Sequence, residues 1–353
     1  MRKLCPSVKS SYFSFIVITL VFSVFEIGLR VNGFQYSQFP REAKQLFIEH
    51  FTKRCFSAKF VPHKERMWAL KPGYGQANEF SYQGKPVPVI KTPGIKRILF
   101  LGDSCVNSGN DQFPEKTILK LKEQYGVVAE ATIAGTASYS TFQGLRWLPD
   151  FLGYKPDALI VYFGWNDHWQ DRGAGPDNMF KPLSQFDLKI KNTFRNIKVY
   201  QFMHYLIYPA QRYHPVDRDV KERLVSFLNH VRVPPVYYMA NIESFISFAR
   251  ENNMEIYFIR PPHGEHIDKT TLYLVPPEFR KRKSVIHETY NYLLEEIVDK
   301  HKEAHLVSFK DIKFDHNLMM YDGIHPLERG HEVIAERLVS KMNETSSLIL
   351  NTY

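Results

Sequence analysis

The chain has 353 residues, a formal net charge of +9 and a pI near 9.2, with 44% hydrophobic and 24% charged residues. This is an ordinary globular composition, and the length suffices for an α/β domain of roughly 200–250 residues with additional segments. The basic charge favours contact with something acidic, such as an anionic lipid or glycan. Nucleic acid is not an expected partner, because no recognition motif or dense basic helix accompanies the charge.

The N-terminus predicts a single membrane-spanning signal anchor over residues 11–31, after a basic cytoplasmic segment at 1–10. Ser10 to Phe25 carries no charge, and counting on through Leu29 approaches the roughly 20 residues that a bilayer core requires. The alternatives are a cleaved signal peptide and a buried soluble helix. The first lacks a small-x-small cleavage site, and the second does not suit an apolar run on all faces. The positive N-terminal residues place the rest of the chain outside the cytoplasm, in a periplasmic or extracellular location.

Three cysteines, Cys5, Cys55 and Cys105, show neither metal-ligand spacing nor a disulfide framework. A Cys55–Cys105 bridge is one alternative in an oxidising compartment. Unpaired buried thiols are the other, and the sequence favours them.

The remainder of the chain predicts an α/β domain preceded by an extension. Residues 32–95 are mixed, with turn signals that favour a few short strands packed on the main domain. Over 96–346, apolar runs alternate with helical patterns, which predicts a three-layer α/β/α fold with a five-stranded parallel sheet. A basic, aromatic insertion at about 170–234 is read as a helical lid, a face resting on the membrane or a peripheral subdomain. The predicted strands cover 95–102, 127–134, 156–164, 255–262 and 305–309.

The first loop that could carry chemistry is GDSC, directly after the first predicted strand. Ser104 would start a helix there, where the positive helix N-terminus and its own backbone N–H suit a nucleophile. The alternative is that Asp103 or Ser104 only caps the helix.

Two further loops follow later strands. FGWNDHW presents Asn166 as a side-chain donor to an oxyanion, or as part of an Asx turn. YDGIHPLERGH holds Asp322 and His325 three positions apart, so one carboxylate can orient an imidazole whose other nitrogen faces a hydroxyl. The alternative for Asp322 is a helix cap, and His168 and His331 are rival bases.

Together these motifs resemble the SGNH, or GDSL-type, hydrolase family, in its membrane-anchored bacterial form. GDS at 102–104, GWND at 164–167 and DGIH at 322–325 match three of its sequence blocks, and the resemblance covers about residues 96–345. It implies the three-layer α/β/α fold and serine esterase chemistry that needs no metal and no organic cofactor.

The resemblance also implies residue roles. Ser104 is the nucleophile, His325 the general base and Asp322 its orienting partner. The oxyanion hole is formed by the backbone N–H groups of Ser104 and Ser138 and by the side-chain amide of Asn166.

The second block of the family departs from the usual pattern. Ile133 stands where members commonly have Asn, and Ser138 stands where they have a glycine, while Gly135 is an earlier glycine of the same loop. Because the glycine acts through its backbone N–H, Ser138 can take its place if the backbone conformation is kept. If that conformation needs φ above zero, a non-glycine residue costs on the order of 1 kcal/mol or more.

The predicted function is that of a serine esterase hydrolysing O-acyl, acetyl-like esters of an extracytoplasmic glycan or lipid. Two alternatives stay open: an acyltransferase acting on surface polysaccharide, and a catalytically silent binding module in surface-polymer assembly. The sequence predicts neither the acyl group nor the acceptor nor the oligomeric state.

Overall fold

The computed structural model describes residues 6–34, 60–73, 77–78, 80–82, 86–106, 112–169, 176–207, 227–270 and 281–350. Its centre is a five-stranded parallel sheet with the strand order β4-β3-β5-β6-β7. The strand of this sheet that comes first along the chain, β3, therefore lies inside the sheet. The later strands are added on both sides of it. The strands are β3 (Lys96–Gly102), β4 (Ala129–Gly135), β5 (Ala158–Tyr162), β6 (Glu255–Ile259) and β7 (Ala304–Val307).

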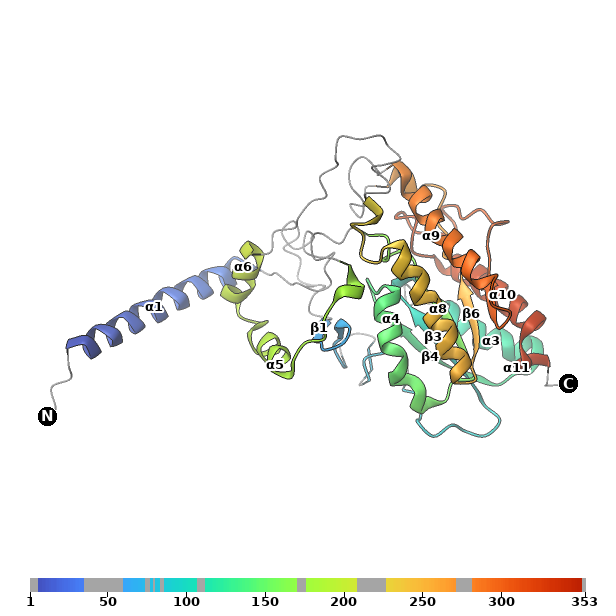
Figure 1. Ribbon diagram of the computed structural model, residues 1–353, viewed down its shortest axis with the longest axis horizontal. Coiled ribbons are helices and arrows are strands. Elements are labelled where there is room, and N and C mark those ends of the chain that lie inside the picture. The colour runs from blue at the N-terminus through green and yellow to red at the C-terminus, as the bar shows by residue number, and fades with distance from the viewer. Residues whose placement is uncertain are drawn as a thin grey trace.

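Helices cover both faces of this sheet (Figure 1). One face packs against α4 (Thr141–Trp147), α8 (Pro235–Glu251) and α9 (Lys283–Val298). The other face packs against α3 (Phe113–Tyr125) and α10 (Glu328–Thr345), with the short α11 (Ser347–Leu350) beyond it. The predicted three-layer α/β/α fold with five parallel strands is confirmed.

The strands build two separate cores because successive side chains point to opposite faces. In β3, Leu99 and Leu101 join the core under α4, α8 and α9, while Ile98 and Phe100 join the core under α3 and α10. All four are at most 1% exposed, as expected for a parallel strand covered on both sides.

The helix boundaries follow local signals. The α3 helix ends at Gly126, whose φ of 68° is left-handed. A capping box between Ser140 and Gln143 starts α4. After α4, Leu148–Tyr154 continues as a 3₁₀ helix, because Pro149 has no N–H to extend the α-helical ladder.

Segments outside the sheet lie on the N-terminal side of the molecule. The strands β1 (Phe60–His63) and β2 (Met67–Leu70) form an antiparallel hairpin. The insertion contributes α5 (Gln185–Phe194) and α6 (Lys198–Ile207). Residues 35–59 of the predicted extension and 208–226 of the insertion lie outside the described residues, and the domain boundaries stay predictions.

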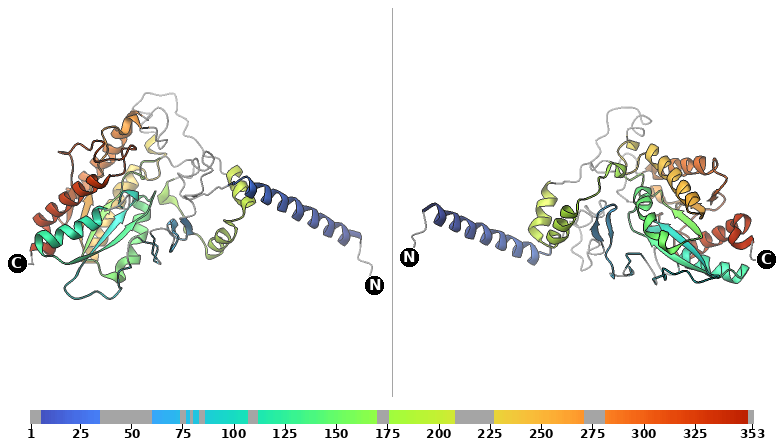
Figure 2. Two further views of the ribbon diagram at one scale, coloured as in Figure 1. Left: turned by 180° about the vertical axis from the view of Figure 1, so that it is seen from behind. Right: turned by 60° about the horizontal axis from the view of Figure 1, so that its bottom comes forward.

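The N-terminal helix α1 (Pro6–Val31) extends away from the sheet in all views (Figure 2). Its segment Ser10–Val31 is the one helix among the described residues that is long and apolar enough to cross a membrane, and none of it is buried. The end of α1 packs on α6: the Val199 N–H donates to the Glu26 carboxylate at 2.8 Å, and the rings of Phe25 and Phe202 meet edge to face at 5.2 Å.

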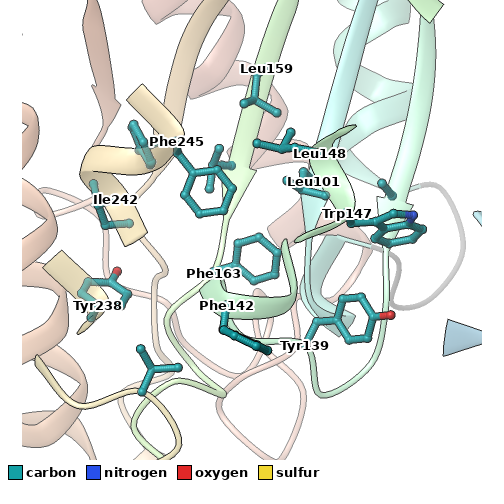
Figure 3. Packing of buried hydrophobic residues seen from close by; sticks show 14 of the residues in the cluster. Leu101, Tyr139, Phe142, Trp147, Leu148, Leu159, Phe163, Tyr238, Ile242 and Phe245 are labelled. Atoms are coloured by element: carbon teal, nitrogen blue, oxygen red, sulfur yellow. The ribbon is translucent and has the colours of Figure 1, made fainter. Parts of the chain in front are cut away.

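Close packing between α4 and the sheet depends on a missing side chain. A Cβ at Gly144 would lie 2.4 Å from the Phe163 ring and 3.2 Å from Phe245, inside the apolar cluster that Figure 3 shows. Interiors packed at this density have no room for an added methyl group.

We therefore expect Gly144→Ala to lower the free energy of unfolding by about 1–3 kcal/mol, the usual cost of overpacking a core. Thermal melting followed by circular dichroism measures the effect. Gly153→Ala is the matched control, because a Cβ at Gly153 meets nothing within 4 Å. Equal melting temperatures for the two variants would contradict the packing described here.

Candidate active site

The segments that carry Ser104, Ser138 and Asn166 leave the sheet at neighbouring strand ends. Gly102, the last residue of β3, pairs with Gly135 of β4 on one side and with Tyr162 of β5 on the other. Parallel strands that end in register bring the segments after them together. The structure thus places Ser104, Ser138 and Asn166 after three adjacent strands.

A hydrogen-bonded chain links three of the predicted residues. Ser104 Oγ lies 2.8 Å from His325 Nε2, and His325 Nδ1 lies 2.6 Å from Asp322 Oδ2. The second oxygen of Asp322 accepts the backbone N–H groups of Ile324 at 2.9 Å and His325 at 3.1 Å. Gly323 makes this tight turn with a φ of 71°, and a Cβ there would also crowd Ile267. One carboxylate therefore fixes both the loop and the imidazole ring.

Asp322 lies well beyond the end of β7, and backbone contacts carry its loop back toward β3. The Gly264 N–H, in the segment after β6, donates to the Gly323 carbonyl at 2.8 Å. The Cys105 thiol approaches the Ile324 carbonyl at 3.6 Å. The loop is thus held between the strand ends of β6 and β3, next to Ser104.

The electrostatics of the pair favour an ionised Asp322 and a basic His325. Burial lowers the pKa of His325, but the hydrogen bond to Asp322, the charge of Asp322 and the charge of Asp103 outweigh it and raise the pKa above 6.5. Burial likewise raises the pKa of Asp322, and the hydrogen bonds and charge of His325 hold it below its usual value. A raised pKa of the imidazole and a lowered pKa of the carboxylate are the shifts that suit a general base and the acid that orients it.

Asp103 and Cys105 organise the turn that carries Ser104. Asp103 Oδ1 accepts the Cys105 N–H at 2.8 Å, and burial raises the pKa of Asp103 to about 6 against this and other hydrogen bonds. Burial raises the pKa of the Cys105 thiol well above its usual range, so this unpaired, buried cysteine stays neutral. Cys55, its rival disulfide partner, lies outside the described residues.

Ser104 begins a 3₁₀ turn rather than an α-helix. Ser104–Val106 is a single 3₁₀ turn, and α3 begins only at Phe113. The capping signal of Asp103 is real, but it closes this one turn.

Ser138 adopts the left-handed conformation that glycine prefers. Its φ is 63°, and the Tyr139 N–H donates to the Thr136 carbonyl at 3.1 Å, which closes a four-residue turn with Ser138 in the third position. A non-glycine residue there costs roughly 1–2 kcal/mol. Among the described residues, no acceptor takes the Ser138 N–H.

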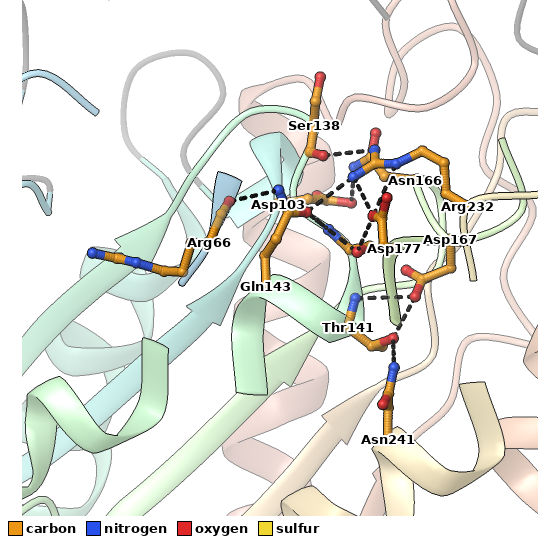
Figure 4. Close-up of polar contacts among 11 residues, drawn as sticks. Arg66, Asp103, Ser138, Thr141, Gln143, Asn166, Asp167, Asp177, Arg232 and Asn241 are labelled. Atoms are coloured by element: carbon orange, nitrogen blue, oxygen red, sulfur yellow. Dashed lines mark hydrogen bonds and ion pairs between the residues drawn. The ribbon is translucent and has the colours of Figure 1, made fainter. Parts of the chain in front are cut away.

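Two residues that the sequence did not indicate support this turn (Figure 4). The Arg232 guanidinium donates to the Ser138 carbonyl at 2.7 Å and to the Asp177 carboxylate at 2.7 and 3.1 Å. Both side chains are fully buried, and both come from the ends of the insertion. A lone arginine in a basic segment carries no motif, so only the positive φ required at Ser138 could have signalled the need for a partner.

Asn166 is hydrogen-bonded to Asp103, the residue before Ser104. Its Nδ2 donates to Asp103 Oδ2 at 3.0 Å, which leaves its second N–H for another acceptor. The neighbouring Asp167 accepts the Thr141 N–H at 3.0 Å, and burial raises the pKa of Asp167 to about 7. These contacts, visible in Figure 4, join the loop after β5 to the start of α4.

The rival histidines are not bonded to Ser104. His168 is buried and lies 3.1 Å from His287, and burial lowers its pKa to about 3. His331 is buried on α10, where it stacks on Phe113. Among the described residues, no group of three His, Cys, Asp or Glu side chains is placed to hold a metal ion.

The fold and the site geometry are those of an α/β/α ester hydrolase. The model of the GDSL-like lipase/acylhydrolase family matches residues 100–333, and the chain belongs to this family. A search of the curated proteins gave no match.

Several solved structures are similar to the chain, all at low identity. A lipase/acylhydrolase from Enterococcus faecalis is 14% identical with a TM-score of 0.45, over 70% of this chain and 96% of that one. Axe2, an acetylxylan esterase from Geobacillus stearothermophilus, is 14% identical with a TM-score of 0.43, over 70% and 94%. TesA is 15% identical with a TM-score of 0.43, over 70% and 99%.

The raised pKa of His325 predicts the acid limb of the pH profile. A general base must be neutral, so kcat/KM for a short-chain aryl ester should fall as the pH drops through a midpoint above 6.5. Circular dichroism across the same range controls for unfolding. A midpoint below 6.5 in folded enzyme would be inconsistent with this assignment.

Proposed function

We propose that the protein is a serine esterase with Ser104 as nucleophile, His325 as general base and Asp322 as its orienting acid. The observation that carries the proposal is the continuous hydrogen-bonded chain from Ser104 Oγ through both nitrogens of His325 to Asp322. As Oγ attacks the ester carbonyl, His325 Nε2 takes its proton and then gives it to the leaving alcohol. The acyl-enzyme is released by a water that His325 activates in the same way.

Three donors are proposed for the oxyanion: the N–H groups of Ser104 and Ser138 and the Asn166 amide. The support for Ser138 is an N–H that no acceptor takes within the described part of the chain. The support for Asn166 is the remaining hydrogen of an amide already oriented by Asp103. Such donors act on charge that develops only in the transition state. Since Ser138 would act through its backbone, a glycine there should serve at least as well.

The substrate class that we propose is an O-acyl, acetyl-like ester on an extracytoplasmic glycan or lipid. The basic net charge and the apolar N-terminal helix support a surface polymer or a membrane component. An acyltransferase would use the same residues but pass the acyl group to a sugar hydroxyl. Comparing release of free acid with and without a glycan acceptor distinguishes the two.

Ser104→Ala should abolish hydrolysis of short-chain aryl esters, because no other described hydroxyl lies on His325. A fluorophosphonate probe should label the wild-type chain but not this variant. Ser244→Ala, at an exposed position in α8, is the control and should keep both activities. Turnover retained in Ser104→Ala would refute the nucleophile, and an unlabelled wild-type chain would favour a silent binding module.

We also propose that α1 anchors the chain with the catalytic domain outside the cytoplasm. The apolar helix and the basic residues that precede it support this orientation. The Glu26–Val199 contact would then lie at the membrane interface and bring α6 close to the bilayer.

The wild-type chain should resist alkaline carbonate extraction from membranes, and protease added to spheroplasts should digest the catalytic domain. Ile16→Lys/Val21→Lys should release the chain, since each lysine at the centre of a span costs about 2.5–3.5 kcal/mol. Val31→Lys, at the helix end, is the matched control. Extraction of the wild-type chain, or protection from external protease, would contradict the anchored topology.

A further inference from the structure

The turn that contains Ser138 needs external support. Ser138 has a φ of 63° without being a glycine, so the turn's own backbone preference opposes the conformation it adopts. The hydrogen bond from Tyr139 to Thr136 closes the turn but leaves the Ser138 carbonyl without a partner inside it. A contact to that carbonyl therefore decides how firmly the conformation is held.

Arg232 makes this contact, and each of its three guanidinium nitrogens is hydrogen-bonded. Its three nitrogens reach the Ser138 carbonyl, the Asp177 carboxylate and the Gln143 side-chain oxygen, the last at 2.9 Å. Arg232 and Asp177 have no exposed side-chain surface. A buried charge of this kind is stable only with its partners in place, so the arginine has little freedom to move.

We propose that Arg232, locked by Asp177, is a positioning residue that keeps the Ser138 N–H directed at the oxyanion. The role rests on the proposed function, because it acts through an oxyanion donor. Fixing the carbonyl fixes the peptide plane after Ser138, and the closed turn restrains the plane before it. Without Arg232, Ser138 relaxes toward a right-handed or extended conformation and its N–H turns away.

The insertion therefore supplies what a glycine would otherwise supply at this turn. Glycine reaches positive φ without a steric penalty, whereas Ser138 reaches it with help from two charged residues. The Trp68 ring of β2, 5.5 Å from the guanidinium carbon, covers the same arginine from the hairpin. Arg232 is thereby held between the insertion that carries it and the hairpin.

Arg232→Lys tests the proposal in the full-length protein. Lysine keeps the positive charge for Asp177, but a single ammonium cannot reach all three partners. We expect kcat for an aryl ester to fall about 10–100-fold with KM within about two-fold, since an oxyanion donor acts in the transition state alone. A rise in KM at unchanged kcat would overturn the role.

The sharper measurement is a double-mutant cycle with Ser138→Gly. Because glycine tolerates positive φ, the loss caused by Arg232→Lys should be at least about five-fold smaller when Ser138→Gly is also present. Equal losses with and without Ser138→Gly, in folded enzyme, would show that Arg232 only stabilises the fold and would overturn the proposal.

Arg97→Lys is the matched control. Arg97 is also a buried arginine that binds one carboxylate, Glu130, and several backbone carbonyls, but it lies at the start of β3, away from the strand ends that carry the site. Its substitution should lower the melting temperature, leave kcat within about three-fold and show no coupling to Ser138→Gly.

Asp177→Asn is the second variant if Arg232→Lys does not fold. Asparagine keeps an acceptor for the Arg232 guanidinium but removes the negative charge that holds it. The kcat loss should therefore be smaller than that of Arg232→Lys, and Ser138→Gly should again relieve it. Additive losses here would overturn the proposal as well. The two proposals fail separately: turnover in Ser104→Ala refutes the esterase assignment, whereas additivity within Ser104-dependent turnover refutes only the role of Arg232.

Discussion

Gly102 ends β3 between Gly135 of β4 and Tyr162 of β5, so three parallel strands stop level with one another. This register fixes where the segments that carry Ser104, Ser138 and Asn166, the proposed nucleophile and oxyanion donors, leave the sheet. The base arrives differently, on a loop that contacts the strand end of β6 through Gly264. Ser104 and His325 are thus held by separate parts of the fold, and the 2.8 Å between Oγ and Nε2 depends on both.

Three buried or half-buried aspartates near this edge have different protonation behaviour, and their surroundings explain the difference. Asp322 faces His325 and has a lowered pKa, whereas burial raises the pKa of Asp103 to about 6 and that of Asp167 to about 7. Of the three, only Asp322 has interactions that stabilise its charged form enough to outweigh the cost of burial. The others serve as acceptors that orient the Cys105 N–H, Asn166 and Thr141.

The inner strands β3, β5 and β6 could be predicted because each is buried on both faces and is therefore a short apolar run between turn signals. Ser104, Asp322 and His325, which the structure brings into contact, could be chosen as candidates because their motifs are local and specific. The type of helix that begins at Ser104 could not be predicted. A residue that caps a single 3₁₀ turn has the same sequence signal as one that caps a long α-helix. Asp177 and Arg232 gave no signal, because a contact between residues 138 and 232 leaves no periodic or spaced pattern.

The insertion joins two structural elements that are otherwise far apart along the chain. Its two ends supply Asp177 and Arg232 to the turn at Ser138, and its helix α6 binds the end of α1. A minimal hydrolase obtained by excising residues 176–234 would keep Ser104, Asp322 and His325 yet lack the Arg232 contact that supports the turn at Ser138. The same excision would remove the packing surface of α1. The insertion therefore cannot be removed without loss of contacts to both the turn at Ser138 and the end of α1.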